Sequence, residues 1–257
     1  MVVPLAQLPL PLDLLPFKYE RGIRLSGADF WLDPHSRRPV AYVSHGHSDH
    51  CLPHGHAVAT PATAEFYRLR TKRSLVTEVP FRQRYVTGDQ SLELFPAGHI
   101  LGASQVMVTG PDGRRLVYTG DFKLRQAPCL DAAEVRECDT LVMECTFGHP
   151  RYRFPTIEQV DAQLRAFVDR CFEQDVIPVV FGYILGKSQE ALCLLTRAGY
   201  SVAAHQTVVR VAEVYEGQGI AFGPYETLDL DNADSLRGKV VLAPPHLRRE
   251  VTAPLLR

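Results

Sequence analysis

Three histidines and an aspartate follow directly on an apolar run, in the stretch YVSHGHSDH at residues 42–50. The apolar run predicts a buried strand, so these polar side chains must gather where the strand ends. In an extended turn, residues two apart point the same way, which lets His45 and His47 face one ion. Asp49 and His50 then reach a neighbouring point. Imidazole and carboxylate groups suit Zn²⁺, Mn²⁺ or Fe, so the pattern favours a metal site over a solvated loop.

Two later stretches supply matching side chains. PAGHILGAS, residues 96–104, places His99 between a predicted strand and a glycine-containing loop. LVYTGDFK, residues 116–123, ends an apolar strand in Gly-Asp, and the carboxylate of Asp121 can bridge two ions. Taken alone, His99 fits a core or turn histidine and Asp121 a turn residue. Beside the first motif, we interpret both as metal ligands.

The bulk composition limits the class of protein. Hydrophobic residues make up 46% of the 257 residues, enough for a full-sized core. The formal net charge of −1 gives no general attraction to nucleic acid or membrane, so binding to a polyanion requires a local patch. No uncharged apolar run approaches ~18 residues, which predicts no membrane span. Six scattered cysteines without a C-x-x-C pair indicate reduced thiols and a cytoplasmic protein.

The first 17 residues are apolar but contain four prolines and no Lys or Arg, which fits an extended arm better than a signal peptide. The rest of the first half is rich in predicted strands. A helix begins after Thr60, with Pro61 at its first position, and a Pro-Asp-Gly turn at residues 111–113 predicts a hairpin. The expected strands are 40–44, 75–79, 91–95, 104–109, 114–119 and 139–144.

The second half of the chain alternates between helical and strand patterns. Helices are expected at 157–172, through Ala191 to Leu195, and through Val208 to Tyr215. The strands between them are expected at 176–181, 201–204 and 240–242. Such alternation predicts a largely parallel sheet, so the fold class is α/β with a strand-rich N-terminal half.

Four motifs, SHGHSDH, AGHILGAS, YTGDF and ECTFG, resemble those of the metallo-β-lactamase fold in its β-CASP nucleic-acid-processing branch. FGHPRYRFP at 147–155 and YILGKSQEAL at 183–192 resemble the bacterial ligase-associated DNA exonucleases, often labelled mRNA 3′-end processing factors. From about residue 24 to the C-terminus, the resemblance implies an αββα sandwich with a β-CASP-like α/β portion. We expect a metallo-β-lactamase core at residues 1–150 and a β-CASP-like region at residues 151–257.

The resemblance also implies two ligand sets for two divalent ions, Zn or Mn. The first ion takes His45, His47 and His99, the second takes Asp49 and His50, and Asp121 matches the carboxylate that bridges them.

Other residues of the implied site act beside the ions. Asp33 in FWLDP matches an aspartate that orients the ligand loop without binding metal. Glu144 matches an acid next to the ligands, and with Asp49 it is a candidate catalytic residue. His205 resembles a position near the cleft of the β-CASP region. Cys145 replaces a usual Ser or Ala, which is a small change.

Two ions about 3.5–4 Å apart can hold a bridging hydroxide and clamp a phosphate, and coordination lowers the pKa of water toward ~7. We expect this hydroxide to attack phosphorus in line with the leaving oxygen, with Asp49 orienting it or taking its proton. The resemblance thus implies a metal-dependent nuclease, a DNA exonuclease of bacterial DNA repair. An RNA-processing nuclease of the same branch and a non-nuclease metallo-hydrolase are the alternatives.

A nucleic-acid substrate, DNA or RNA, requires positive charge beside the ions. Arg151 and Arg153 combine charge with an aromatic stacking surface, and Lys187 stands at an expected helix start, which suits a phosphate. A solvated face is the alternative for each, and it is favoured for the basic stretch at residues 68–84. A DNA ligase or a helicase is the protein partner that the resemblance implies.

One ligand of the implied second ion is missing. The family carries a further histidine in a D-H-A or similar motif, but after Asp121 only His149, His205 and His246 remain, and none stands in such a motif. Either the C-terminal part is truncated or the protein manages without this ligand, and we favour truncation. We therefore expect one well-held ion and impaired two-metal catalysis. His205 is the first candidate to complete the second site.

Overall fold

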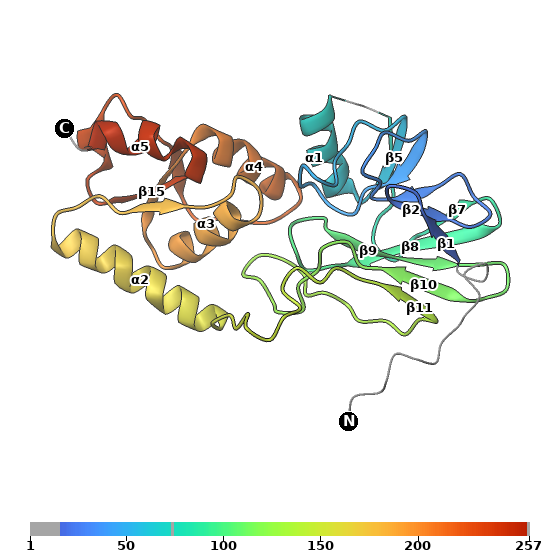
Figure 1. Ribbon diagram of the computed structural model, residues 1–257. Coiled ribbons are helices and arrows are strands. Elements are labelled where there is room, and N and C mark those ends of the chain that lie inside the picture. The colour runs from blue at the N-terminus through green and yellow to red at the C-terminus, as the bar shows by residue number, and fades with distance from the viewer. Residues whose placement is uncertain (1–15, 73–74, 256–257) are drawn as a thin grey trace. The chain divides into compact units, whose positions relative to one another are not determined.

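The computed structural model describes residues 16–72 and 75–255 (Figure 1). Strands dominate the first half of the chain and alternate with helices in the second, so the predicted α/β class is confirmed. Most of the expected arm at residues 1–17 lies outside the described residues. Within the described ranges, no helix is long and apolar enough to cross a membrane.

The first sheet holds six strands in chain order, β1 to β6. Strands β1 to β3 are antiparallel, whereas β3 to β6 are parallel. Helix α1, Pro61–Thr71, joins β5 to β6 and contacts both strands, as a connection between parallel strands requires. The strands are Phe17–Tyr19, Ile23–Leu25, Trp31–Leu32, Val40–Tyr42, His56–Ala59 and Val76–Glu78.

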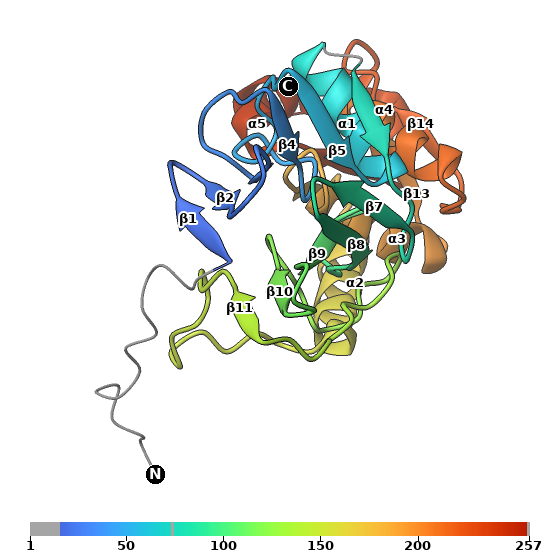
Figure 2. The same ribbon diagram turned by 90° about the vertical axis from the view of Figure 1, so that its right-hand side faces the viewer.

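The second sheet holds five strands in the order β11-β10-β9-β8-β7, which lie side by side in Figure 2. Its antiparallel part includes the hairpin predicted at residues 111–113, which pairs Thr109 of β9 with Arg115 of β10. Strand β11 is parallel to β10. The strands are Arg84–Thr87, Gln90–Pro96, Ser104–Thr109, Arg115–Tyr118 and Thr140–Val142, for β7 to β11.

One apolar cluster joins the two sheets. It contains Leu25 and Tyr42 from the first sheet and Leu94, Val106 and Leu116 from the second. The other face of the first sheet packs against α1, in a cluster that includes alanines of β5 and Tyr67 of the helix. Since side chains alternate across a strand, both faces of the first sheet are buried and the layers follow the order helix, sheet, sheet.

A third sheet, β12-β15-β13-β14, is parallel throughout, as the alternation in the second half predicts. Helices α2, α3 and α4 pack on one face, and a 3-10 turn and α5 pack on the other. The strands β12 to β15 are Val179–Phe181, Ser201–Ala204, Tyr225–Thr227 and Lys239–Ala243. The helices α2 to α5 are Ile157–Glu173, Lys187–Arg197, Gln206–Gly217 and Arg248–Leu255, and the 3-10 turns η2 and η3 are Ala233–Leu236 and Pro245–Leu247.

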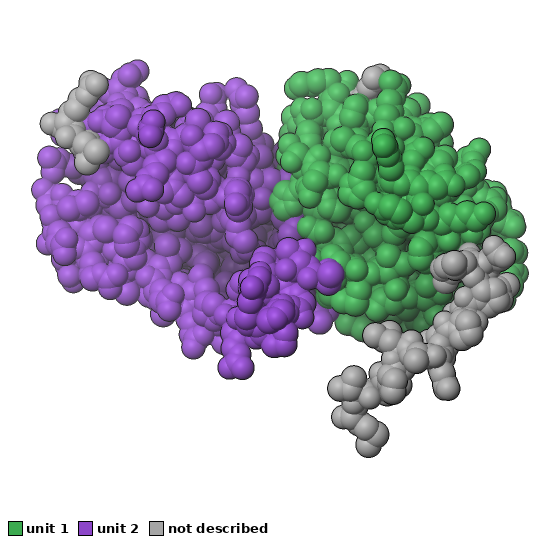
Figure 3. All heavy atoms as spheres, in the orientation of Figure 1, with its two compact units in different colours: residues 1–97, 102–122, 134–144 green, residues 98–101, 123–133, 145–257 purple. Residues whose placement is uncertain are grey.

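The chain forms two compact units, which Figure 3 distinguishes by colour. The first unit contains residues 1–97, 102–122 and 134–144, and the second contains 98–101, 123–133 and 145–257. Each unit has its own apolar core. The domain division at residue 150 stays a proposal.

Several elements differ from the sequence-based expectations. The strand expected at 176–181 begins only at Val179. Strand β5, directly after the histidine-rich loop, was not predicted, because its four residues begin with His56 and contain two alanines. Helix α5 was missed because it is short and contains Pro254. Strands β1 to β3 have only two or three residues each, too few to show a period of two.

Candidate metal centre

Three connections deliver the candidate ligands, and each follows a strand. The loop after β4 carries His45 and His47, the loop between β8 and β9 carries His99, and Asp121 comes three residues after β10. One ligand atom from each of these four residues lies within 4.8 Å of the others. The structure therefore brings together the side chains that the sequence assigns to one ion. Their role as metal ligands is a proposal.

The two histidines of the H-x-H pair face each other. His45 is fully buried, and its Nδ1 lies 2.9 Å from Oγ of Ser44. Its Nε2 lies 3.0 Å from Nδ1 of His47 and 3.8 Å from Oδ2 of Asp121. Two nitrogens bound to one tetrahedral ion at ~2.0–2.1 Å would be about 3.3 Å apart. The separation and the chemistry of these donor atoms fit a shared ion such as Zn²⁺.

Asp33 contacts the loop that carries the candidate ligands at both ends, at Ser44 and at His50. It is buried, and its φ of 39° lies in the left-handed region, which aspartate tolerates better than most residues. Its Oδ1 accepts a hydrogen bond from the backbone of Ser44 at 2.8 Å, and its Oδ2 lies 2.8 Å from Nδ1 of His50. A carboxylate on Nδ1 leaves Nε2 of the same imidazole as the metal-binding atom.

The remaining candidate ligands lie around that Nε2 atom. It is 3.6 Å from Oδ1 of Asp121 and 3.7 Å from Oδ2 of Asp49. Asp121 therefore presents one oxygen to His45 and the other to His50. This arrangement suits a carboxylate that bridges two ions.

The electrostatics of the site favour a bound cation. Burial lowers the pKa of His50, but the hydrogen bond and charge of Asp33, aided by two further carboxylates, outweigh it and raise the pKa to about 9. Burial raises the pKa of Asp121, and the charge of His50 opposes this change. The charges of Glu144 and Asp49 raise it further. A divalent ion would relieve the cost of holding these carboxylates ionised and close together.

Gly120 allows the two strand ends to approach each other. Its φ is 53°, and a Cβ atom there would lie 2.6 Å from the side chain of Ser44. Any other residue would strain the backbone and push Asp121 away from the histidine loop.

Two residues that support the loop were missed from the sequence. Arg70 of α1 donates its Nε–H to the carbonyl of Gly46 at 3.2 Å, between His45 and His47. Tyr118 donates its hydroxyl to Oδ2 of Asp33 at 3.0 Å. Arg70 belongs to the basic stretch at residues 68–84, for which the sequence favours a solvated face. No local pattern marks either contact, because both join segments far apart in the chain.

Glu144 lies just beyond β11 and next to Asp121. Its Oε1 accepts a hydrogen bond from the backbone N–H of Phe122 at 3.3 Å. Its own N–H donates to Oγ1 of Thr119 at 3.4 Å. These contacts flank Asp121 in the chain and support a role for Glu144 in holding that connection.

The candidate nucleic-acid contacts belong to the second unit. Arg151 stacks over Tyr152, with Cζ 4.7 Å from the ring centroid. Lys187 begins α3 and pairs with Glu190 at 3.1 Å. Arg153 is exposed. The ring of His205 contacts Thr207 at the start of α4, where its Nδ1 accepts the backbone N–H at 3.2 Å.

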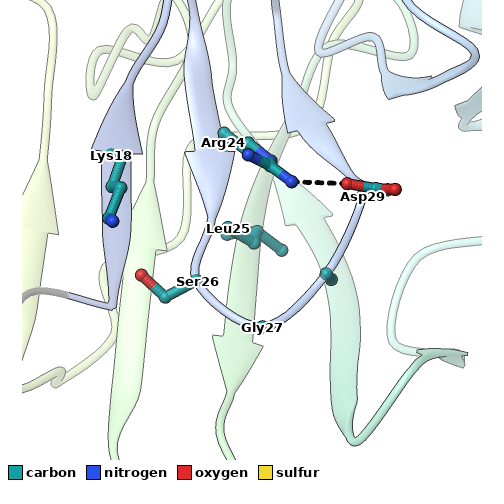
Figure 4. Close-up of a pocket in the computed structure, with 7 residues that line it drawn as sticks. Lys18, Arg24, Leu25, Ser26, Gly27 and Asp29 are labelled. Atoms are coloured by element: carbon teal, nitrogen blue, oxygen red, sulfur yellow. Dashed lines mark hydrogen bonds and ion pairs between the residues drawn. The ribbon is translucent and has the colours of Figure 1, made fainter.

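A hollow of about 550 Å³ in the first unit lies at the turn between β2 and β3 (Figure 4). Lys18, Arg24, Ser26 and Asp29 are among its lining residues. Its lining contains no histidine, and its one carboxylate, that of Asp29, lies 2.5 Å from the guanidinium of Arg24. The chemistry of this lining does not suit a metal ion.

No protein-family model matches the chain. It is 38% identical over 233 residues to a probable DNA ligase of Opitutus terrae, covering 90% of this chain and 23% of that protein. It is 26% identical over 117 residues to an RNase J-like protein of Methanocaldococcus jannaschii, covering 45% of this chain and 28% of that protein. It is 24% identical over 202 residues to the DNA cross-link repair 1A protein of Mus musculus, covering 71% of this chain and 19% of that protein. The chain thus spans less than a third of the length of each of these relatives.

Proposed function

We propose that this chain, which belongs to the β-CASP branch of the metallo-β-lactamase fold, is a metal-dependent phosphodiesterase that acts on nucleic acid. The observation that carries the proposal is the position of Asp121 between two sets of ligand atoms. Oδ2 faces His45 at 3.8 Å, and Oδ1 faces His50 at 3.6 Å. Two divalent ions, Zn or Mn, held by these sets would supply Lewis acidity and positive charge for a phosphate group.

The chain's own side chains have distinct tasks in this proposal. Asp49, whose side chain is 72% exposed, is open to an incoming phosphodiester and is placed to orient the attacking water or take its proton. Asp33 fixes the ring of His50, and Glu144 holds the backbone beside Asp121. Guanidinium and ammonium groups bind phosphate oxygens, a role that we assign to three residues of the second unit, Arg151, Arg153 and Lys187.

We propose DNA as the substrate and DNA repair as the setting, with exonucleolytic cleavage in the cytoplasm and a DNA ligase or a helicase as the partner. The names of two relatives, which refer to DNA ligation and DNA cross-link repair, support this choice. The RNase J-like relative favours RNA processing as the second candidate function.

Cleavage assays test the proposal. The purified chain is incubated with end-labelled single-stranded DNA, duplex DNA and RNA, in Mn²⁺, Zn²⁺ or EDTA. We expect slow, metal-dependent shortening of DNA from one end, which EDTA abolishes. Preferential cleavage of RNA would replace the first candidate by the second. A folded, metal-loaded chain that cleaves none of these substrates would overturn both.

A further inference from the structure

A wholly exposed loop joins Glu144 to helix α2. All twelve residues from 145 to 156 are exposed, and three of them are aromatic. The exposed fractions are 58% for Phe147, 38% for Tyr152 and 60% for Phe154. Contiguous apolar patches on a protein surface mark interaction sites, whereas single scattered apolar residues do not.

The three rings form one cluster centred on Phe147. The centroid of Phe147 lies 5.3 Å from that of Tyr152 and 5.0 Å from that of Phe154. The interplanar angles are 80° and 86°, so both contacts are edge-to-face. Each ring braces another, which holds the cluster in place while leaving much of its surface open.

Local contacts keep the loop in a defined conformation. Backbone hydrogen bonds close two turns, from Gly148 to Cys145 and from Tyr152 to His149, each at 3.0 Å. Arg125 donates to the carbonyl of Pro155 at the far end of the loop. Ordering that precedes ligand binding lowers the entropic cost of that binding.

The charge of the loop shows which ligand it suits. Residues 145–156 contain two arginines and no aspartate or glutamate, although the whole chain has a net charge of −1. The guanidinium of Arg151 lies over the ring of Tyr152, and Arg153 stands between Tyr152 and Phe154 in the chain. Alternating rings and cations match the alternating bases and phosphates of a nucleic-acid strand.

We propose that Phe147, Tyr152 and Phe154 form a stacking platform for unpaired bases of a single-stranded nucleic acid, with Arg151 and Arg153 on its phosphates. The inference rests on the proposed function for its class of substrate. It deepens that function, because it makes a single strand the form that the site receives. In a duplex the faces of the bases are already stacked on each other, so only unpaired bases can use the rings.

Covalent geometry limits how far Phe147 of the platform can lie from Glu144. Phe147 follows Glu144 by three residues, so the two Cα atoms are at most about 11 Å apart. The carboxylate of Glu144 accepts the N–H of Phe122, the residue after Asp121. A connection of three residues therefore joins the platform to the residue that supports the Asp121 connection.

Binding without cleavage tests the platform. Fluorescence anisotropy in EDTA compares a labelled oligothymidylate with an abasic strand of the same length and with a duplex. Since one stacked base contributes ~1–3 kcal/mol, we expect the wild type to prefer the oligothymidylate over the abasic strand by about tenfold or more. The variants Phe147→Ala and Phe154→Ala should lose most of that preference, whereas Phe154→Trp should keep or increase it.

A matched control separates stacking from a general loss of an exposed ring. Tyr19→Ala removes a ring that is 72% exposed on β1, and it should leave the preference unchanged. The platform is overturned if both alanine variants keep the wild-type preference for thymidine over abasic strands, or if the wild type has no such preference. Loss of cleavage with base-dependent binding intact would count against the nuclease proposal and leave the platform standing.

Discussion

Asp33 and Asp49 are carboxylates of the same site in opposite environments. Asp33 is buried, and both of its oxygens contact other groups, the N–H of Ser44 and the ring of His50. Asp49 is largely exposed and approaches only the edge of the site, 3.7 Å from Nε2 of His50. Burial and hydrogen bonding make Asp33 a structural anchor, whereas the exposure of Asp49 fits the catalytic role that we propose for it.

The first prediction concerns Asp49→Ala. We expect cleavage of the phosphodiester to be abolished, because the variant removes a charge that orients the attacking water. The melting temperature should stay within about 2 °C of wild type, since exposed side chains away from caps and cores contribute little to stability. Rates and thermal melts measured together check this. Asp112→Ala, at the exposed hairpin turn, is the control, and near-wild-type cleavage by Asp49→Ala would contradict the assigned role.

A second prediction concerns Asp33→Asn. The amide can still accept from Ser44, but its NH₂ group would donate to Nδ1 of His50 and move the imidazole proton to Nε2. Affinity for the ion at Asp49 and His50 should therefore fall about 10–100-fold, as expected when a partner that orients a ligand is lost. Calorimetric titration with Zn²⁺ measures it. An unchanged titration would show that Asp33 has no part in orienting the ligand.

Among the elements, helix α1 links the metal-site loops to the fold. Its N-cap, Thr60, accepts the N–H of Thr63 at 3.3 Å and donates its hydroxyl to the carbonyl of Gly102 at 2.6 Å. Gly102 lies in the connection between β8 and β9, which also carries His99. At the other end of the helix, Arg70 holds the loop of the H-x-H pair. One helix thus contacts two of the three connections that supply the candidate ligands.

The third prediction tests this link. Thr60→Ala removes both hydrogen bonds of the cap and should lower the free energy of unfolding by about 1–2 kcal/mol, whereas Thr60→Ser should change it by less than about 0.5 kcal/mol. Urea denaturation of the two variants measures the difference. Equal stabilities for alanine and serine would show that the hydroxyl contributes nothing there.

At the scale of the whole molecule, the ligand sets proposed for the two ions differ in number. The first set contains His45, His47, His99 and Asp121, enough for a closed tetrahedral site. The second set, as the described residues supply it, contains Asp49, His50 and the second oxygen of Asp121. Three ligands hold an ion less tightly than four.

The fourth prediction follows from this difference in the number of ligands. After dialysis against metal-free buffer, elemental analysis should find about one ion per chain, and His99→Ala should lower that number, because it removes a ligand of the complete set. Two tightly held ions would show that a further residue completes the second set. His205→Ala would then be the variant to analyse. Retention of both ions by this variant would show that His205 does not complete the second set.

The sequence by itself determined the class of fold and the identity of most of the proposed ligands. The metal-binding pattern of residues 42–50 can be recognised locally, because the backbone of an extended turn points residues two apart in the same direction. The helix starting at Pro61 and the hairpin at residues 111–113 were predictable for the same reason, since caps and tight turns depend on neighbours in the chain. Local signals of this kind need no knowledge of tertiary packing.

Only the tertiary structure decided how those residues face one another. Asp121 turns one oxygen to each ligand set because β10 ends beside the loop after β4, with Gly120 allowing the close approach. Strand β5 and the contact of Arg70 with Gly46 likewise depend on packing between distant segments. A sequence pattern reports the preferences of a segment, whereas distances between side chains are set where separate segments bury their apolar faces together. The sequence therefore determines the chemical identity of the proposed ligands, whereas their arrangement in space depends on the packing of the folded core.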